Sequence, residues 1–80
     1  MLVIAPDLEI RGKEKKTSQK GKDYVIVRVD DVTGKLIELL DWNTDNYDKY
    51  NRGDKADFTL KLDIGKYINI SIADFTIKAE

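Results

Sequence analysis

Residues 11 to 22 hold six basic side chains and one acid, so this stretch carries a net charge of +5 in a chain whose formal net charge is −1. The acid is Glu14, and the basic residues are Arg11, Lys13, Lys15, Lys16, Lys20 and Lys22. Such a separation of charge produces a local positive field that attracts phosphate groups. A solvated, lysine-rich hairpin tip that discourages edge pairing is the simpler interpretation of the same pattern.

An aromatic residue, Tyr24, follows the basic run and begins the alternating segment "DYVIVRV". An outward aromatic ring beside lysines can stack an unpaired base, which contributes about 1 to 3 kcal/mol per base. The pattern therefore predicts an arm that binds phosphates, with Tyr24 as its stacking residue. Arg28 shares the face of Tyr24, and two roles stay open for it: a phosphate contact, or an ion pair with a cross-strand carboxylate such as Glu38.

Composition excludes most catalytic chemistry. The chain has 80 residues and contains neither cysteine nor histidine, so thiolate sites, disulfides and imidazole chemistry are absent. Its carboxylates cannot be assigned to one cleft, and no nucleophile lies next to a base. We expect a protein that is not an enzyme, with no metal and no cofactor. The length predicts one domain over residues 1–80.

The opening "MLVIAPDLEI" lacks a basic start, and Pro6 and Asp7 interrupt its apolar run. Neither a secretion signal nor a membrane span is therefore expected, and a cytoplasmic protein is the default.

Strand-like alternation dominates the chain. A first strand is expected from Leu8, running out through a polar, solvated half towards residue 17. Residues 23–29 form the second strand, with valines 25, 27 and 29 inward, and residues 35–42 form the third. The segment "NTDNYDKYNRG" can hold one helical turn, with Thr44 as its N-cap. Tyr47 and Tyr50 are expected to plug the open end of the structure, and Trp42 is expected to be a half-buried cap.

The last third of the sequence predicts a regular β-hairpin. In "ADFTLKLDI" the even positions Phe58, Leu60, Leu62 and Ile64 are inward, and Gly65 with Lys66 opens the turn. In the final arm the inward face changes parity around Ala73 and Asp74, which predicts a β-bulge. Five strands without a long helix favour an all-β, five-stranded OB-type barrel, with an SH3-like barrel as the alternative.

The segment "QKGKDYVIV" resembles the basic loop of filamentous-phage single-stranded DNA-binding proteins, in which Gly-Lys-x-Tyr leads into the second strand. The final "LDIGKYINISIADFTIKAE" resembles the closing hairpin of that family. Members are dimeric OB-fold proteins that coat single strands with little sequence preference. The resemblance implies that Lys22 contacts the DNA backbone, Tyr24 stacks, and Tyr67 is the hairpin-tip aromatic that reaches DNA or a neighbouring dimer.

Two departures from the family are visible. Asp74 stands where the family has Arg, and the turn at residues 32–35 lacks the family's aromatic. Either the central strand pair contributes less stacking here, or Trp42 supplies it. Accessory proteins of conjugative and other mobile elements are a neighbouring family, and the sequence does not choose between phage and plasmid.

Two functional hypotheses follow. The first is sequence-tolerant binding of single-stranded DNA, with RNA as an alternative ligand, in phage or mobile-element replication or transfer. The second is a small barrel that serves as a protein-protein interaction module without nucleic-acid binding. A homodimer is expected in addition, because the core is small and the hairpin is apolar and regular.

Overall fold

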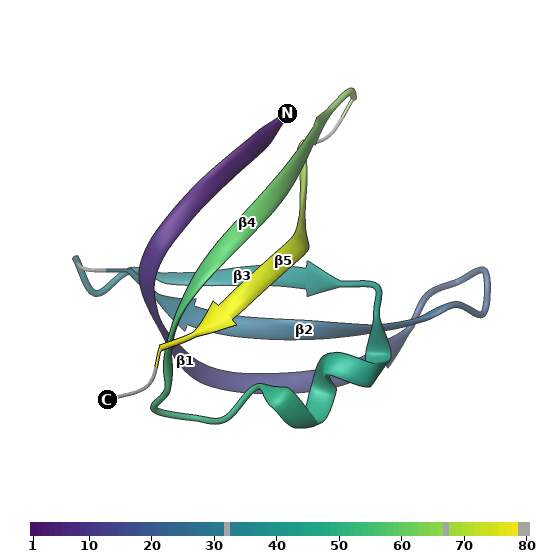
Figure 1. Cartoon of the computed structure of the whole chain (residues 1–80). Coiled ribbons are helices and arrows are strands. Elements are labelled where there is room, and N and C mark those ends of the chain that lie inside the picture. The colour runs from purple at the N-terminus through teal and green to yellow at the C-terminus, as the bar shows by residue number, and fades with distance from the viewer. Residues whose placement is uncertain (32, 67, 79–80) are drawn as a thin grey trace.

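The computed structural model describes residues 1–31, 33–66 and 68–78 and consists of five strands and one short helix (Figure 1). The elements are β1 (Leu2–Thr17), β2 (Asp23–Asp30), β3 (Leu36–Asp41), the 3-10 helix η1 (Thr44–Lys49), β4 (Lys55–Ile64) and β5 (Ile68–Ile77). The expected all-β class is confirmed. No helix in these three ranges is long and apolar enough to cross a membrane.

The strands close into a barrel in the order β1-β2-β3-β5-β4. The long β1 pairs with β2 through its second half and with β4 through its first half. A single parallel bridge between Leu40 and Ser71 joins β3 to β5 and closes the ring. A five-stranded barrel with one shared, strongly bent first strand is the OB arrangement, so the predicted OB-type barrel is confirmed.

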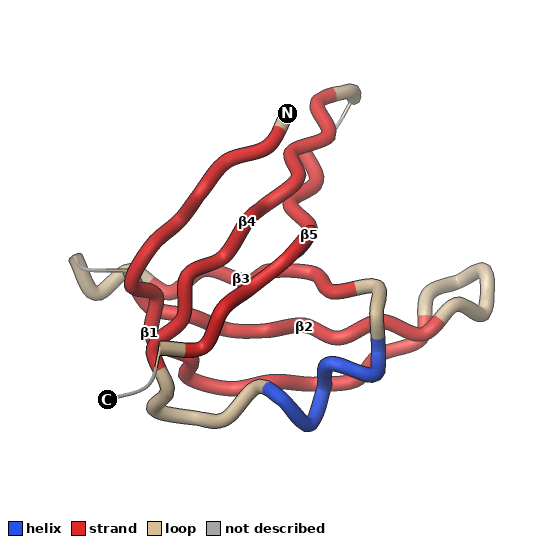
Figure 2. The backbone as a smooth tube through the Cα atoms, in the orientation of Figure 1, coloured by secondary structure: helices blue, strands red, loops and turns tan. Residues whose placement is uncertain are grey.

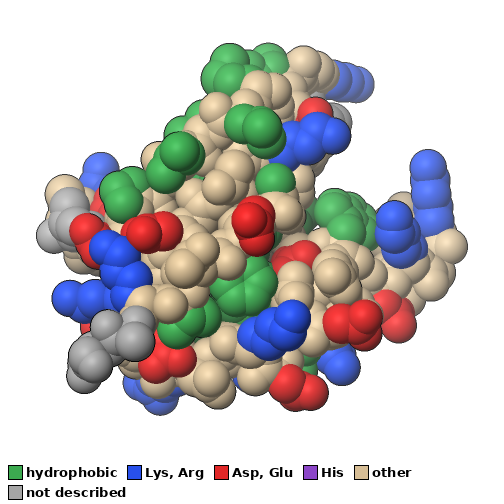
Figure 3. Space-filling model, in the orientation of Figure 1, with side chains coloured by type: hydrophobic (Ala, Val, Ile, Leu, Met, Phe, Trp, Pro, Cys, Tyr) green, Lys and Arg blue, Asp and Glu red, His purple; other side chains and the backbone are tan. Residues whose placement is uncertain are grey.

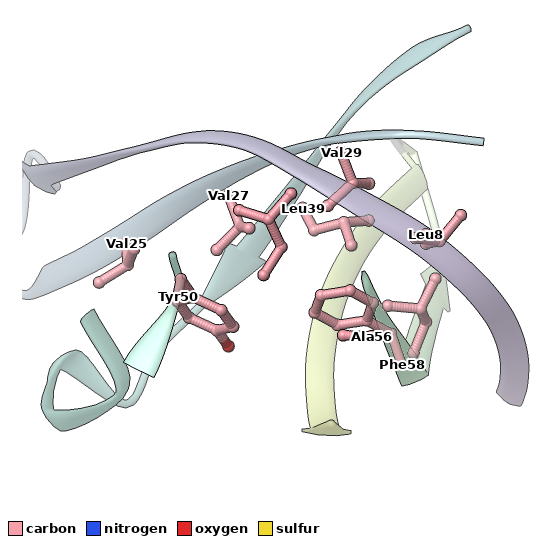
Figure 4. Packing of buried hydrophobic residues seen from close by; sticks show 10 residues of the cluster. Leu8, Val25, Val27, Val29, Leu39, Tyr50, Ala56 and Phe58 are labelled. Atoms are coloured by element: carbon pink, nitrogen blue, oxygen red, sulfur yellow. The ribbon is translucent and has the colours of Figure 1, made fainter. Parts of the chain in front are cut away.

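Inward side chains from β1 to β4 fill the barrel (Figure 4). Strand alternation places Val25, Val27 and Val29 on the inner face of β2, where all three are fully buried as predicted. Phe58 on β4 and Tyr50 after η1 are the largest fully buried side chains. The rings of Tyr50 and Phe58 stack with centroids 6.3 Å apart, so the aromatic side chains of these two segments pack together inside the barrel.

The predicted β-bulge lies at Ala73. Thr59 pairs with Asp74 and Leu60 pairs with Ile72, so Ala73 is the additional residue on β5. The bulge bends the strand as it passes from the projecting hairpin into the barrel. The inward assignment of Ile64 was wrong: its side chain is 66% exposed, because the β4–β5 hairpin extends beyond the barrel.

The first strand begins at Leu2, earlier than predicted. Residues 2–5 pair with β4, and the register shifts between Ala5 and Leu8 around Asp7, which has a positive φ of 57°. Proline is tolerated at position 6 because it lies on a strand edge at this irregularity. The first half of β1, β4 and β5 therefore form a three-stranded sheet that rises above β2 and β3 (Figure 2).

The helix η1 covers the open end of the barrel. Its N-cap is Asn43, whose side chain accepts a hydrogen bond from the Asp45 N–H at 3.2 Å, so the prediction of Thr44 was wrong by one residue. Tyr50 is buried and Tyr47 packs against the core from η1, which confirms the predicted plug. The predicted solvated half of β1 is exposed at residues 15–17, whereas Lys13 and Glu14 are only partly exposed.

Candidate nucleic-acid interface

The outer face of β2 carries Tyr24, Ile26 and Arg28, as the alternation predicts. Cross-strand partners on β3 share this face, so Leu40 lies beside Ile26. Continuing the same register by one residue brings Trp42 beside Tyr24. The two rings lie 5.2 Å apart, tilted by 52°, and form an aromatic pair at one end of this face.

Trp42 is not the half-buried barrel cap that the sequence predicts. Its side chain is 43% exposed, and its ring contacts Tyr24 on the outside of the barrel, because Tyr50 already closes the interior. The ammonium of Lys22 lies 5.1 Å from the centre of the Trp42 ring. An exposed indole beside a lysine offers both a stacking surface and a positive charge to a nucleotide.

The loop between β1 and β2 is a compact turn that presents its lysines outward. The N–H of Gly21 donates to the carbonyl oxygen of Ser18 at 2.9 Å, and the Ser18 hydroxyl oxygen accepts from the Lys22 N–H at 3.1 Å. Gly21 has a φ of 82°, a conformation that side chains with a Cβ rarely adopt. These contacts place Lys20 and Lys22 at the exposed loop tip, as predicted.

Lys16 completes the positive end of the outer face. It pairs with Tyr24 across β1 and β2, and residues opposite one another in an antiparallel pair share a face. In the described ranges, neither Lys16 nor Lys20 has a hydrogen-bond or ion-pair partner. Basic side chains gather at the edge of the molecule where the β1–β2 loop projects (Figure 3). Lys16 and Lys22 therefore lie beside the aromatic pair, and Lys20 lies in the adjoining loop.

Two other predicted lysines point to a different side. Lys13 pairs with Val27 and Lys15 pairs with Val25, so both lie on the inner face of β1, at the end covered by η1. The Lys13 ammonium donates to the Tyr47 carbonyl oxygen at 2.7 Å and lies 4.2 Å from the centre of the Tyr47 ring. The Lys15 ammonium lies 4.7 Å from the same ring. The structure thus divides the basic run between two faces.

Both predicted arginines form ion pairs. Arg28 contacts Glu14 at 3.1 Å and Glu38 at 3.5 Å, which is the cross-strand alternative left open by the sequence. Arg11 lies at the bulge of β1 and contacts Glu9 at 2.9 Å, and hydrogen bonding to this carboxylate raises the pKa of Arg11. Their charges are therefore partly neutralised. Tyr67, the predicted hairpin-tip contact, lies outside the described residues.

A shallow groove lies on the outer face, beyond the aromatic pair. It has a volume of about 310 Å³ and is lined by Ile26, Glu38, Leu40, Asn69 and Ile70. The groove thus runs between β2 and β3 on one side and the start of β5 on the other. Its floor is apolar, so bases could lie there, while the carboxylate of Glu38 makes the far end unfavourable for phosphates.

Sequence reasoning gave Trp42 only as an alternative source of stacking, and it missed Ile26 and Leu40 as parts of this surface. The signal for Trp42 was present, because a residue one position beyond β3 in register with Tyr24 must share its face. Nothing in the sequence identifies Ile26 and Leu40 as groove residues, because apolar residues on a strand face more often belong to the core. Only the bend of β5 shows that these two line an open groove.

No protein-family model matches the chain, and no curated protein has a matching sequence. Among solved structures, the fold is similar to the mitochondrial single-stranded DNA-binding protein Rim1 of S. cerevisiae. The superposition has a TM-score of 0.69 and covers 96% of this chain and 94% of Rim1, at 9% sequence identity. At this identity, the likeness shows the fold: the chain has the OB-type barrel that this protein has.

Proposed function

We propose that the protein binds single-stranded DNA with little sequence preference, through the outer face of β2 and β3. The observation that carries the proposal is the Tyr24–Trp42 pair, in which Tyr24 is partly exposed and Trp42 is exposed, with the ammonium of Lys22 next to the indole. Stacking and phosphate contact are the two interactions that sequence-tolerant single-strand binding requires. In OB folds the outer face of the second and third strands and the loops beside it hold oligonucleotides.

The distribution of polar groups on this surface supports binding of single strands with little preference for base sequence. Lys16 and Lys22 lie beside the aromatic pair, and lysines bind phosphates of any nucleotide, whereas Asp74 lines the pocket on the other side of Trp42. The floor of the groove is formed by Ile26 and Leu40, which offer no hydrogen bond to a base edge. Aromatic rings stack on every base, because each base has a π-face. The likeness to Rim1, whose name records single-stranded DNA binding, agrees with this function.

A role in phage or mobile-element replication or transfer belongs to the same proposal. It is supported by the resemblance of the segment around Lys22 and Tyr24, and of the closing hairpin, to filamentous-phage proteins. In that role the protein would coat and protect single strands in the cytoplasm, without acting as an enzyme. Replacing the DNA probe with an RNA of the same sequence tests the alternative ligand.

Fluorescence anisotropy of a labelled oligo-dT, repeated with the duplex and over a range of salt, tests the proposal. We expect oligo-dT to bind more tightly than the duplex, because a paired base offers no free face to Tyr24 or Trp42. Affinity should fall linearly on a log-log plot against salt, because counterions are released from the phosphates. Equal binding of both forms, or no binding at low salt, would overturn the proposal and favour the protein-interaction module.

A further inference from the structure

A pocket opens where β3 and β5 separate. Among the described residues, the bridge between Leu40 and Ser71 is the whole pairing of these two strands, and the bulge at Ala73 bends β5 two residues later. The space between the end of β3, η1 and the bent strand has a volume of about 580 Å³ (Figure 1). This volume lies within the range of about 300 to 1,000 Å³ that is typical of small-molecule sites.

Trp42 belongs both to the proposed DNA surface and to this pocket. Its ring contacts Tyr24 on the outer face, with 5.2 Å between the ring centroids, and the residue also lines the pocket together with Phe75. A strand that stacks one base on the Tyr24–Trp42 pair therefore brings a neighbouring nucleotide to the pocket.

Polar side chains that line the pocket keep free hydrogen-bonding groups. The Oδ1 atom of Asp74 accepts from the Phe75 N–H at 2.8 Å, which orients the carboxylate and leaves Oδ2 without a partner in the described parts of the chain. Asn46 donates its side-chain amide to the Asp41 carboxylate at 2.9 Å, so its own carbonyl oxygen stays available. The ammonium of Lys49 has no hydrogen bond or ion pair with a described residue.

These groups suit a base and not a phosphate. The carboxylates of Asp41 and Asp74 both line the pocket, and their negative charge disfavours a phosphate there. A base can instead donate its N–H groups to the free oxygens of Asp74 and Asn46, and it can accept from Lys49 through a carbonyl oxygen.

Guanine matches a carboxylate better than the other bases do. Its Watson–Crick edge has two neighbouring donors, N1–H and the N2 amino group, and its O6 is an acceptor to which lysine donates. In adenine and cytosine the amino group lies next to a ring nitrogen that is an acceptor, and in thymine the single N–H lies between two carbonyl oxygens. These acceptors would face the second carboxylate oxygen, which weakens binding.

We infer that the pocket binds one unpaired guanine of the strand, with Asp74 accepting from its N1–H and N2 amino groups and Lys49 donating to its O6. The inference rests on the proposed function, because the strand carries the guanine to the pocket. The other nucleotides are held by stacking and by lysines, so the preference concerns one position of the strand. A paired guanine does not fit, because its partner base occupies the same edge.

Anisotropy titrations compare a labelled oligo-dT of about eight nucleotides with the same strand carrying one central dG. We expect the dG strand to bind at least about fivefold more tightly, and a strand with deoxyinosine, which lacks the N2 amino group, to lose most of this gain. Equal binding of the dG strand and either of the other two would overturn the inference. Tighter binding of a strand with one central dA or dC would overturn it as well.

Asp74→Asn tests the carboxylate, because it keeps an oxygen for the Phe75 N–H and replaces the other acceptor with a donor. The readout is the affinity ratio of the dG and dT strands, since removal of a negative charge strengthens the binding of both. We expect the preference for dG to disappear. Asp48→Asn, on η1, removes the same charge at an exposed residue that is not among those lining the pocket, and should keep the preference. An unchanged ratio in Asp74→Asn would contradict the inference.

Free nucleosides separate the pocket from strand binding. Trp42 is the only tryptophan in the chain, so its indole N–H signal in a proton–nitrogen correlation NMR spectrum needs no further assignment. We expect guanosine to shift this signal more than thymidine does in the unmodified chain, but not in Asp74→Asn. If oligo-dT does not bind while guanosine still gives the larger shift, the proposed function fails and the pocket assignment holds. Equal shifts with both nucleosides, or none, would overturn the inference.

Discussion

The hydroxyl of Tyr50 donates a 2.5 Å hydrogen bond to the carboxylate of Asp41, which is only 2% exposed. The same carboxylate accepts from the Asn43 N–H at 2.9 Å and from the Asn46 side-chain amide at 2.9 Å. Asp41 is the last residue of β3 and directly precedes Trp42. A buried network in the core thus fixes the backbone from which the exposed indole projects.

Tyr50→Phe should lower the free energy of unfolding by about 1 to 3 kcal/mol, because the buried Asp41 carboxylate loses one donor without gaining another. Urea denaturation followed by circular dichroism measures the change. Tyr47→Phe is the matched control, since its ring packs at the surface of the core, and its hydroxyl has no partner in the described parts of the chain. Equal stability of Tyr50→Phe and the unmodified chain would contradict the structural role of this bond.

Stability should decrease at alkaline pH in a manner that depends on Tyr50. Burial, together with the hydrogen bond to Asp41, raises the pKa of the Tyr50 phenol above its ordinary value of 10.0. When folding raises the pKa of a group, that group stabilises the folded state fully at every pH below its pKa in the unfolded chain. This stabilisation is lost as the pH rises above the unfolded-state pKa. The loss should therefore begin near pH 10.

Urea midpoints of the unmodified chain and Tyr50→Phe, compared from neutral pH to about pH 11, test this linkage. The other tyrosines and the lysines are common to both proteins, so the difference between the two curves reports on Tyr50. We expect the two midpoints to converge as the pH rises. A constant difference across the whole range would show that the Tyr50 phenol ionises equally in both states.

Lysines around the aromatic pair should control the salt dependence of DNA binding, whereas Tyr24 should control its strength at every salt concentration. Lys16→Ala, Lys20→Ala and Lys22→Ala should each reduce the magnitude of the slope of log K against log salt by about 0.7. Tyr24→Ala should lose about 1 to 3 kcal/mol of binding free energy with nearly the same slope. Anisotropy titrations of labelled oligo-dT measure both quantities.

Two further lysines serve as comparisons for these titrations. Lys55 lines a groove with the carboxylates of Asp7, Glu9, Asp30 and Asp31, so Lys55→Ala should leave the slope unchanged. Lys13 holds the Tyr47 carbonyl oxygen, so Lys13→Ala should lower stability more than it changes the slope. A slope that falls equally for Lys13, Lys16 and Lys55 would mean that only the total charge matters, and not the site.

The barrel was predictable because its signals are local. The alternation of valines 25, 27 and 29 gives the inner face of β2, and the parity change near Ala73 gives the bulge. The division of the basic run was not predictable, because it depends on the bulge at Arg11 and on where η1 lies. A run of lysines has no apolar alternation that would show which of them face Tyr47 and which face Tyr24.

The sequence does not show whether Trp42 lies inside the barrel or on its outer surface. Either Trp42 or Tyr50 could have closed the barrel, since both rings are large and lie near the end of β3. Tyr50 occupies the interior because its hydroxyl finds the Asp41 carboxylate there, whereas Trp42 stays 43% exposed on the outside. An aromatic side chain that carries a polar atom is buried where this atom finds a hydrogen-bond partner. The tertiary structure determines where such a partner lies.

Trp42 also provides a direct measurement of the proposed interface, because it is the only tryptophan in the chain. If a base stacks on the indole, saturating oligo-dT should quench the intrinsic fluorescence, and the quenching should follow the same binding curve as the anisotropy. Trp42→Phe should retain most of the affinity, since a phenyl ring still stacks, whereas Trp42→Ala should lose about 1 to 3 kcal/mol. Circular dichroism of both variants checks that the barrel remains intact. Unchanged Trp42 fluorescence at a DNA concentration that saturates the anisotropy signal would place the nucleic acid elsewhere on the barrel, and the lysines facing Tyr47 would then be the next surface to test.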